Sequence, residues 1–287
     1  MKLMIKPLAA LMTVLASLTM ISCSKQNTAV ISPDGNISLR FATNDEGKPL
    51  YSVEYKGKML VVPSELGLEL YDAPVLSAGF SVKNVLKNTF DETWEMPWGE
   101  QRKVRNHYNE MTVVLKENSD PHREMHLIFR AYDDGVAFRY HIPYMAGSDS
   151  LFIAEEHSHF RLAGDHTCWW VPGDWDINEH LYNKTLFSQI DAIGKRNHPN
   201  LAQTYIPHNA VNTPITMRTA EGLHLSFHEA GLMDYAAMTL EVEPEAQSMK
   251  TTLVGSENRP YKVSHALPFS SPWRMIQISP DAAGLIT

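Results

Sequence analysis

The densest group of chemically useful side chains lies in the stretch CWWVPGDWDINEHLYNKT, residues 168–185. Two adjacent tryptophans precede a Pro-Gly turn, and four oxygen-bearing side chains follow it: Asp174, Asp176, Asn178 and Glu179. Tryptophan rings can stack on sugars, paired carboxyl groups hydrolyse glycosides, and carboxylate oxygens bind calcium. This stretch is therefore the first candidate for a site.

A self-contained calcium loop is excluded by the spacing. Asp174, Asp176 and Asn178 match the first three ligand positions of an EF-hand loop. The sixth position should be glycine but is Glu179, and the twelfth should be glutamate but is Thr185. Any calcium ion at this loop would therefore need ligands from elsewhere.

The two tryptophans cannot both face a ligand, because neighbouring strand residues point to opposite faces. We take Trp170 as a candidate sugar contact, with core or interface packing as the alternative for at least one of the pair. Trp98 in PWGEQR and the polar Asn212 in NTP are further candidates for substrate binding, whereas Thr213-Pro214 is interpreted as a strand start.

The other acids and histidines of the chain do not indicate a catalytic or metal site. Asp133 and Asp134 precede Gly135 and are interpreted as turn residues, so they do not form a catalytic pair. His157 and His159 lack a third ligand at close spacing and are expected to be solvated. No pair of catalytic carboxylates is assigned in this chain.

The start of the chain predicts export. Lys2 and Lys6 precede an apolar run too short for a membrane span, so residues 1–22 are expected to be a signal peptide. LTMISCSK resembles a lipoprotein signal with Cys23 as the lipidated residue, followed by a tether at 23–30. We expect a bacterial cell-envelope protein, lipid-anchored to a membrane or periplasmic. Ordinary signal cleavage that removes Cys23 is the alternative.

Composition limits the remaining function classes. The 287 residues are 44% hydrophobic and carry a net charge of −8, with lysine and arginine scattered along the chain. A nucleic-acid partner is therefore not expected. If Cys23 carries lipid, Cys168 is the one cysteine left, and an internal disulfide cannot form.

Alternating apolar residues predict strands almost throughout. EMHLIFRAYDDGVAFRYHI predicts a hairpin, and LHLSFHEA, MTLEV, MKTTLVG and WRMIQIS repeat the pattern at short intervals. TLFSQIDAIGK is the best helix candidate and is short. The expected fold is all-β, a large antiparallel β-sandwich in one domain over residues 31–275.

Five blocks of sequence carry a family resemblance. WEMPWGEQRKVRNHYNEMTVVL, FRAYDDGVAFRY, CWWVPGDWDINEHLYNKT, NTPITMRTAEGLHLSFHEA and SPWRMIQI together resemble the N-terminal domain of glycoside hydrolase family 97. This family comprises α-glucosidases and α-galactosidases of polysaccharide-degrading bacteria. The blocks occur in the family's order and span nearly all of the mature chain.

The resemblance implies a β-super-sandwich followed by a (β/α)8 catalytic barrel and a small β domain. The sequence does not contain the barrel, so residues 276–287 are expected to be a truncated linker toward it, with a plain buried terminal strand as the alternative. The family's catalytic carboxylates cannot be assigned here. The resemblance also implies that the N-terminal domain gives one glutamate to a calcium ion shared with the barrel. Glu179 is the best match.

Three functions remain open. The first is the N-terminal part of a calcium-dependent α-glycosidase that acts on α-linked oligosaccharides and is inactive without its barrel. The second is a stand-alone carbohydrate-binding module that uses the tryptophan-rich stretch. The third is a structural sandwich that packs against partner domains.

Overall fold

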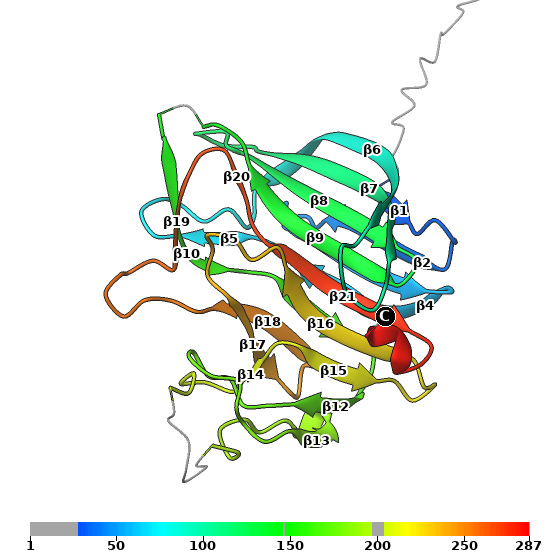
Figure 1. The fold of residues 1–287 in the computed structure, drawn as a ribbon. Coiled ribbons are helices and arrows are strands. Elements are labelled where there is room, and N and C mark those ends of the chain that lie inside the picture. The colour runs from blue at the N-terminus through cyan, green and yellow to red at the C-terminus, as the bar shows by residue number, and fades with distance from the viewer. Residues whose placement is uncertain (1–27, 146, 197–203, 287) are drawn as a thin grey trace, which may run out of the picture.

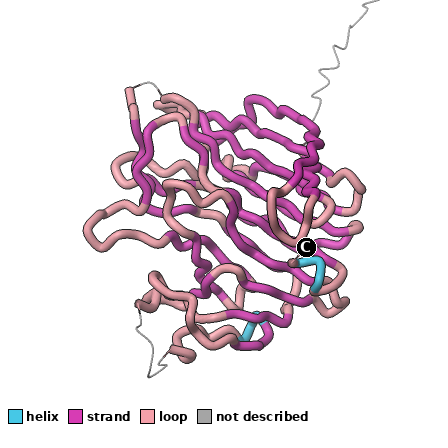
Figure 2. The backbone as a smooth tube through the Cα atoms, viewed as in Figure 1, coloured by secondary structure: helices cyan, strands magenta, loops and turns pink. Residues whose placement is uncertain are grey.

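The computed structural model describes residues 28–145, 147–196 and 204–286. Two large antiparallel sheets stack face to face, and a small third sheet lies beside them (Figure 1). Strands and loops make up this part of the chain, with two single 3-10 turns, η1 (Phe187–Gln189) and η2 (Ala283–Leu285) (Figure 2). The predicted all-β sandwich is confirmed. The helix candidate TLFSQIDAIGK forms only the short η1 turn.

The eight-stranded sheet has the order β1-β2-β3-β4-β11-β18-β17-β14. Its strands are β1 (Ala29–Ile31), β2 (Ile37–Thr43), β3 (Pro49–Tyr55), β4 (Lys58–Glu65), β11 (His159–Leu162), β18 (Ser248–Leu253), β17 (Met238–Glu243) and β14 (Ala210–Asn212). The small sheet joins β19 (Val263–Ala266), β10 (Ser150–Glu156) and β5 (Leu68–Leu70).

The ten-stranded sheet has the order β13-β12-β15-β16-β21-β9-β8-β7-β6, and β20 pairs with β9. Its strands are β13 (Asn183–Leu186), β12 (Thr167–Trp170), β15 (Ile215–Arg218), β16 (His224–Ala230), β21 (Trp273–Ser279), β9 (Gly135–Ile142), β8 (Glu124–Tyr132), β7 (Lys103–Glu117), β6 (Phe80–Glu95) and β20 (Phe269–Ser270). The strands β12 and β13 thus lie at the opposite end of this sheet from β6 and β7.

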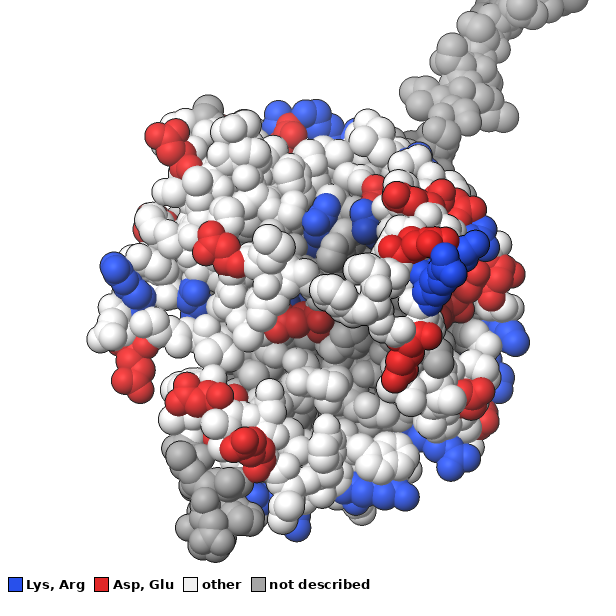
Figure 3. Space-filling model, viewed as in Figure 1, with Lys and Arg blue, Asp and Glu red and all other residues white. Residues whose placement is uncertain are grey.

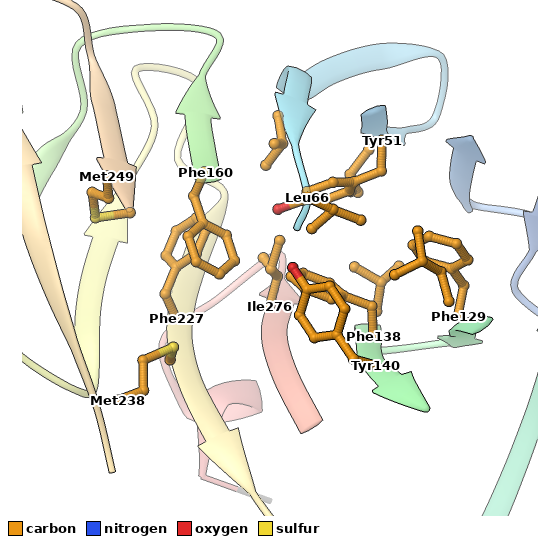
Figure 4. Close-up of a cluster of buried hydrophobic side chains, with 14 of the residues drawn as sticks. Tyr51, Leu66, Phe129, Phe138, Tyr140, Phe160, Phe227, Met238, Met249 and Ile276 are labelled. Carbon is orange, nitrogen blue, oxygen red and sulfur yellow. The ribbon is translucent and has the colours of Figure 1, made fainter. Parts of the chain in front are cut away.

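The core forms where the inner faces of the two large sheets meet. The ring of Tyr51 from β3 lies 5.0 Å from that of Phe138 in β9, and Phe160 in β11 lies 5.5 Å from Phe227 in β16 (Figure 4). All four rings are buried. Along the central strands, such as β8 and β9, apolar residues at alternate positions therefore face the opposing sheet, as expected for sheet-on-sheet packing.

The predicted hairpin between β8 and β9 is confirmed. The Asp-Gly pair indicated a tight turn with positive φ angles, and the turn differs in this respect. Tyr132 pairs with Gly135 across a turn of Asp133 and Asp134, and none of the turn residues has a positive φ. Gly135 is required instead by close packing, because a Cβ there would lie 2.4 Å from the carbonyl oxygen of Ile276 in β21.

The predicted domain boundary at residue 275 is wrong. Strand β21 runs to Ser279 between β16 and β9, with Ile276 and Ile278 in the core, and η2 packs against β21 and β16. Residues 276–279 are thus part of the sandwich and not a linker, because their removal would open the middle of the ten-stranded sheet.

The predictions for the start of the chain fall on residues that the structure does not describe. The signal peptide at 1–22, Cys23 and most of the tether at 23–30 lie outside the described residues. The strand β1 already begins at Ala29. In the described part of the chain, no helix is long and apolar enough to span a membrane.

Candidate functional site

The strands β12 and β13 hold the ends of the acidic loop, which we define as residues 171–182. Trp170 in β12 is fully buried, and its Nε1 donates a hydrogen bond to Oγ1 of Thr185 in β13 at 3.0 Å. Trp170 therefore fills the core and does not contact a sugar, which corrects the prediction. Its neighbour Trp169 lies on the outer face, so the expectation that at most one of the two can face a ligand holds.

Asp174 organises the acidic loop from within. Its side chain is buried and accepts hydrogen bonds from the backbone N–H groups of Asp176 at 2.9 Å and Ile177 at 3.2 Å, and from the backbone and hydroxyl of Thr204. Nε2 of His180 lies 3.1 Å from its Oδ2. Asp174 is thus used to shape the loop and has no free oxygen to present.

The charge of Asp174 is stabilised by these bonds. Burial by itself would raise the pKa of the carboxyl, but the hydrogen bonds from Thr204, Asp176 and Ile177 favour the ionised form and lower the pKa to about 2. A permanently charged carboxylate therefore anchors the loop near neutral pH.

Asn212 at the end of β14 also belongs to this scaffold. Its Oδ1 accepts the backbone N–H of Asp174 at 3.0 Å, and its Nδ2 donates to the carbonyl oxygen of Ile177 at 3.1 Å and to Oδ1 of Asn178. Asn212 is buried and its amide is fully occupied within the loop. The prediction that Asn212 binds a sugar hydroxyl is therefore wrong, and the residue positions the acidic loop instead.

Glu179 differs from Asp174, the buried acid of the loop. It is exposed, and it makes no hydrogen bond or ion pair with any residue that the structure describes. The neighbouring Asp174, Asn178 and His180 are held by the loop, so their contacts fix the backbone on both sides of Glu179. The loop thus presents the free carboxylate of Glu179 on a braced backbone, beside the exposed side chain of Asp176.

A complete metal site is not found within the described ranges, where no group of three His, Cys, Asp or Glu side chains could hold an ion. His157 lies 3.3 Å from Glu69, whereas His159 in β11 is half-buried and its pKa is lowered by burial, so HSH is not simply a solvated pair. Calcium binds six to eight oxygens. The acidic loop could therefore contribute one or two carboxylates to a calcium ion, those of Glu179 and the exposed Asp176, and the remaining ligands would have to come from elsewhere.

Trp98 lies on a different connection of the sheet from the acidic loop. It is 82% exposed at the turn between β6 and β7, and five strands of the ten-stranded sheet separate β7 from β12. In the described part of the chain, no hydrogen bond or ring contact joins Trp98 to Glu179 or Trp169. An exposed tryptophan remains available for contact with a sugar or a protein.

A groove on the outer face of the ten-stranded sheet is the feature that sequence reasoning missed. Its volume is about 770 Å³, and Trp169 lines it together with His224, His228 and Gln277, while Ile286 lies at its border. Strand alternation places these outer residues opposite the buried Leu225, Phe227, Ile276 and Ile278. The same alternation in the sequence could have predicted which residues line this outer face.

Comparison with known proteins identifies the family. A retaining alpha-galactosidase of Bacteroides thetaiotaomicron is 23% identical over 292 residues, which cover 94% of this chain and 41% of that protein. A glycoside hydrolase family 97 enzyme of Pseudoalteromonas sp. strain K8, solved in complex with panose, has a TM-score of 0.79 at 30% identity over 90% of this chain and 36% of its own.

The same Pseudoalteromonas enzyme in complex with acarbose gives a TM-score of 0.78 at 30% identity, again over 90% of this chain and 36% of that one. The chain thus spans less than half the length of these relatives. Residues 30–287 match the family described as Glycosyl-hydrolase 97 N-terminal, and the chain therefore belongs to that family.

Proposed function

We propose that this chain is the N-terminal, carbohydrate-associated domain of a calcium-dependent α-glycosidase. In this proposal the sandwich packs on a catalytic barrel and completes the barrel's substrate and metal site. Membership of the family supports the proposal, as do relatives that are a retaining alpha-galactosidase and an enzyme in complex with panose.

The observation that carries the calcium part is the isolated carboxylate of Glu179. An exposed acid without a partner is common on surfaces, but this one stands on a loop whose backbone is fixed by the buried Asp174 and Asn212. Because this backbone is already ordered, the carboxylate can enter a shared coordination sphere at a lower entropic cost. A bound calcium ion would supply electrostatic stabilisation to a reacting glycoside.

Glu179 can be tested in a chimaera in which residues 30–287 replace the corresponding part of the Pseudoalteromonas enzyme. Panose hydrolysis by the chimaera should require calcium, and Glu179→Gln should shift this requirement to much higher calcium concentrations. Asp176→Asn is the matched control, because Asp176 is an exposed acid of the same loop whose side chain no loop contact requires. Equal calcium dependence of the wild type and Glu179→Gln would contradict the assignment.

We also propose that the mature protein begins at Cys23 and is held at the bacterial cell envelope by lipid on that residue. The apolar run that ends in ISCSK supports this proposal, because a lipid anchor would keep the enzyme near its glycan. Mass spectrometry of the native protein should find a lipidated N-terminal cysteine. An unmodified N-terminus at another residue would refute it.

A further inference from the structure

The outer face of the ten-stranded sheet is only partly covered over its central strands, where the connection between β6 and β7 also lies in front of it (Figure 1). Figure 1 shows β9, β21 and β16 toward the viewer, and the only helical element that packs against them in the described residues is the single turn η2. The same face in Figure 3 is hollowed in the middle, where few charged side chains lie, while lysine, arginine, aspartate and glutamate gather toward the rim.

A stack of cationic and aromatic side chains crosses this face. The guanidinium groups of Arg130 and Arg139 each lie 4.3 Å from the ring centroid of Trp273, and Arg130 also lies 4.1 Å from that of Tyr108. Nε of Arg130 donates to Glu110 at 2.8 Å. The stack therefore holds two guanidinium groups and one carboxylate.

Arg139 is the cation that this arrangement leaves without an acid. Its Nε is buried and has no hydrogen-bond partner among the described residues. Burial and the neighbouring charge of Arg130 lower the pKa of Arg139. A half-buried guanidinium next to a second one is costly unless an anion joins it, so the stack is one negative charge short.

Further unpaired groups lie on the same face. Nδ1 of His224 and His228 in β16 and Nε2 of His126 in β8 are buried without a hydrogen-bond partner in the described part of the chain, although Nε2 of His126 lies 3.9 Å from Glu124. Buried polar groups are nearly always hydrogen-bonded. Tryptophan, tyrosine and arginine with few other charges are also the composition of interface cores. The face thus has the character of an interface without its partner.

The face is continuous with the acidic loop. Trp169, which lines the groove beside His224 and His228, lies one residue before the end of β12, and the acidic loop with Glu179 begins directly after that strand. A single body that contacts Glu179 can therefore also cover the groove and extend toward Trp273.

We propose that the outer face of the ten-stranded sheet is the surface on which the catalytic domain docks, and that this domain presents a carboxylate to Arg139. The inference rests on the proposed function and adds the docking surface and the chemistry of its partner: a largely apolar patch with hydrogen-bonding groups for the histidines and one acid for the Arg130–Trp273–Arg139 stack.

Oxidative footprinting tests the surface. Hydroxyl-radical oxidation of Trp169 and Trp273 should be several-fold slower in the Pseudoalteromonas chimaera than in the isolated chain. Met59 is the internal control, because it is 39% exposed on β4 of the other large sheet and should oxidise equally in both. Unchanged oxidation of Trp169 and Trp273 would overturn the proposal.

Two substitutions test the carboxylate partner. Arg139→Gln in the chimaera should restore fast oxidation of Trp273, whereas Arg40→Gln on the exposed side of β2 should not. In the isolated chain Arg139→Gln should leave the thermal midpoint unchanged or raise it, because it removes an unpaired charge. A large drop in that midpoint would overturn the proposal even without a folded chimaera, since Arg139 would then serve the sandwich alone.

The two proposals fail separately. Protected tryptophans together with a calcium requirement that ignores Glu179→Gln would refute the metal role and leave the docking surface standing. A calcium requirement that depends on Glu179, with Trp169 and Trp273 as reactive as in the isolated chain, would refute the docking surface alone.

Discussion

The guanidinium of Arg274 donates two hydrogen bonds of 2.7 Å to the carboxylate of Glu156, and both side chains are fully buried. The pair joins β21 of the ten-stranded sheet to β10 of the small sheet. Glu229 approaches the same guanidinium, and the hydroxyls of Ser158 and Tyr235 also donate to Glu156. Every partner is satisfied, so the network stabilises one arrangement of the sheets.

Substitution of Arg274 should therefore strongly destabilise the fold. We expect Arg274→Met to lower the free energy of unfolding by about 3–5 kcal/mol, because it leaves the carboxylate of Glu156 buried without its cation. Urea denaturation of the isolated chain measures this loss. Arg105→Met is the control, since Arg105 pairs with Asp91 on the exposed surface and should leave the urea midpoint nearly unchanged. Similar midpoints for the two variants would contradict the argument.

Urea denaturation should also distinguish the contributions of the two neighbouring tryptophans to stability. Trp170→Ala removes a fully buried indole and its bond to Thr185, so we expect a loss of about 3–5 kcal/mol. Trp169→Ala removes a half-buried ring from the outer groove and should cost far less. Equal losses would show that Trp169 packs as tightly as Trp170.

Strand patterns predicted most of the fold because burial repeats at every second residue. In β8, Met125, Leu127 and Phe129 are buried while the residues between them are not, as the sequence indicated. The same logic could not orient β12, because Cys168, Trp169 and Trp170 are all apolar and alternation alone does not say which face is inner. The prediction for Trp170 was wrong for that reason.

Long-range contacts were out of reach of the sequence. Asn212 bonds to Asp174, which lies 38 positions earlier, and nothing local to NTP indicates that partner. The need for Gly135 likewise comes from Ile276 on another strand. In contrast, the boundary at 275 could have been avoided, because Ile276 and Ile278 continue the alternation of WRMIQIS. Local patterns thus predict strands, while the scaffold of the site depends on topology.

The ionised Asp174 makes acid stability testable. Its pKa falls from 3.8 to about 2 on folding, so its contribution is present above about pH 4 and is lost as the pH falls through about 2. Asp174→Asn should be less stable than the wild type at pH 7, and this difference should shrink between about pH 4 and pH 2. Urea midpoints across this range provide the measurement, with the exposed Asp176→Asn as the control. A pH-independent difference would contradict the role of the charge.

The last prediction concerns calcium and the isolated chain. Within the described residues Glu179 offers one carboxylate, and no group of three potential ligands accompanies it. One carboxylate among the six to eight oxygens that calcium takes cannot bind the ion firmly, so titration calorimetry should find an affinity no tighter than about the millimolar range. Glu179→Gln should leave the thermal midpoint of the isolated chain unchanged with or without calcium, because the side chain supports no internal contact. Micromolar binding by the isolated chain would mean that this domain holds the ion by itself, and the shared site would then be wrong.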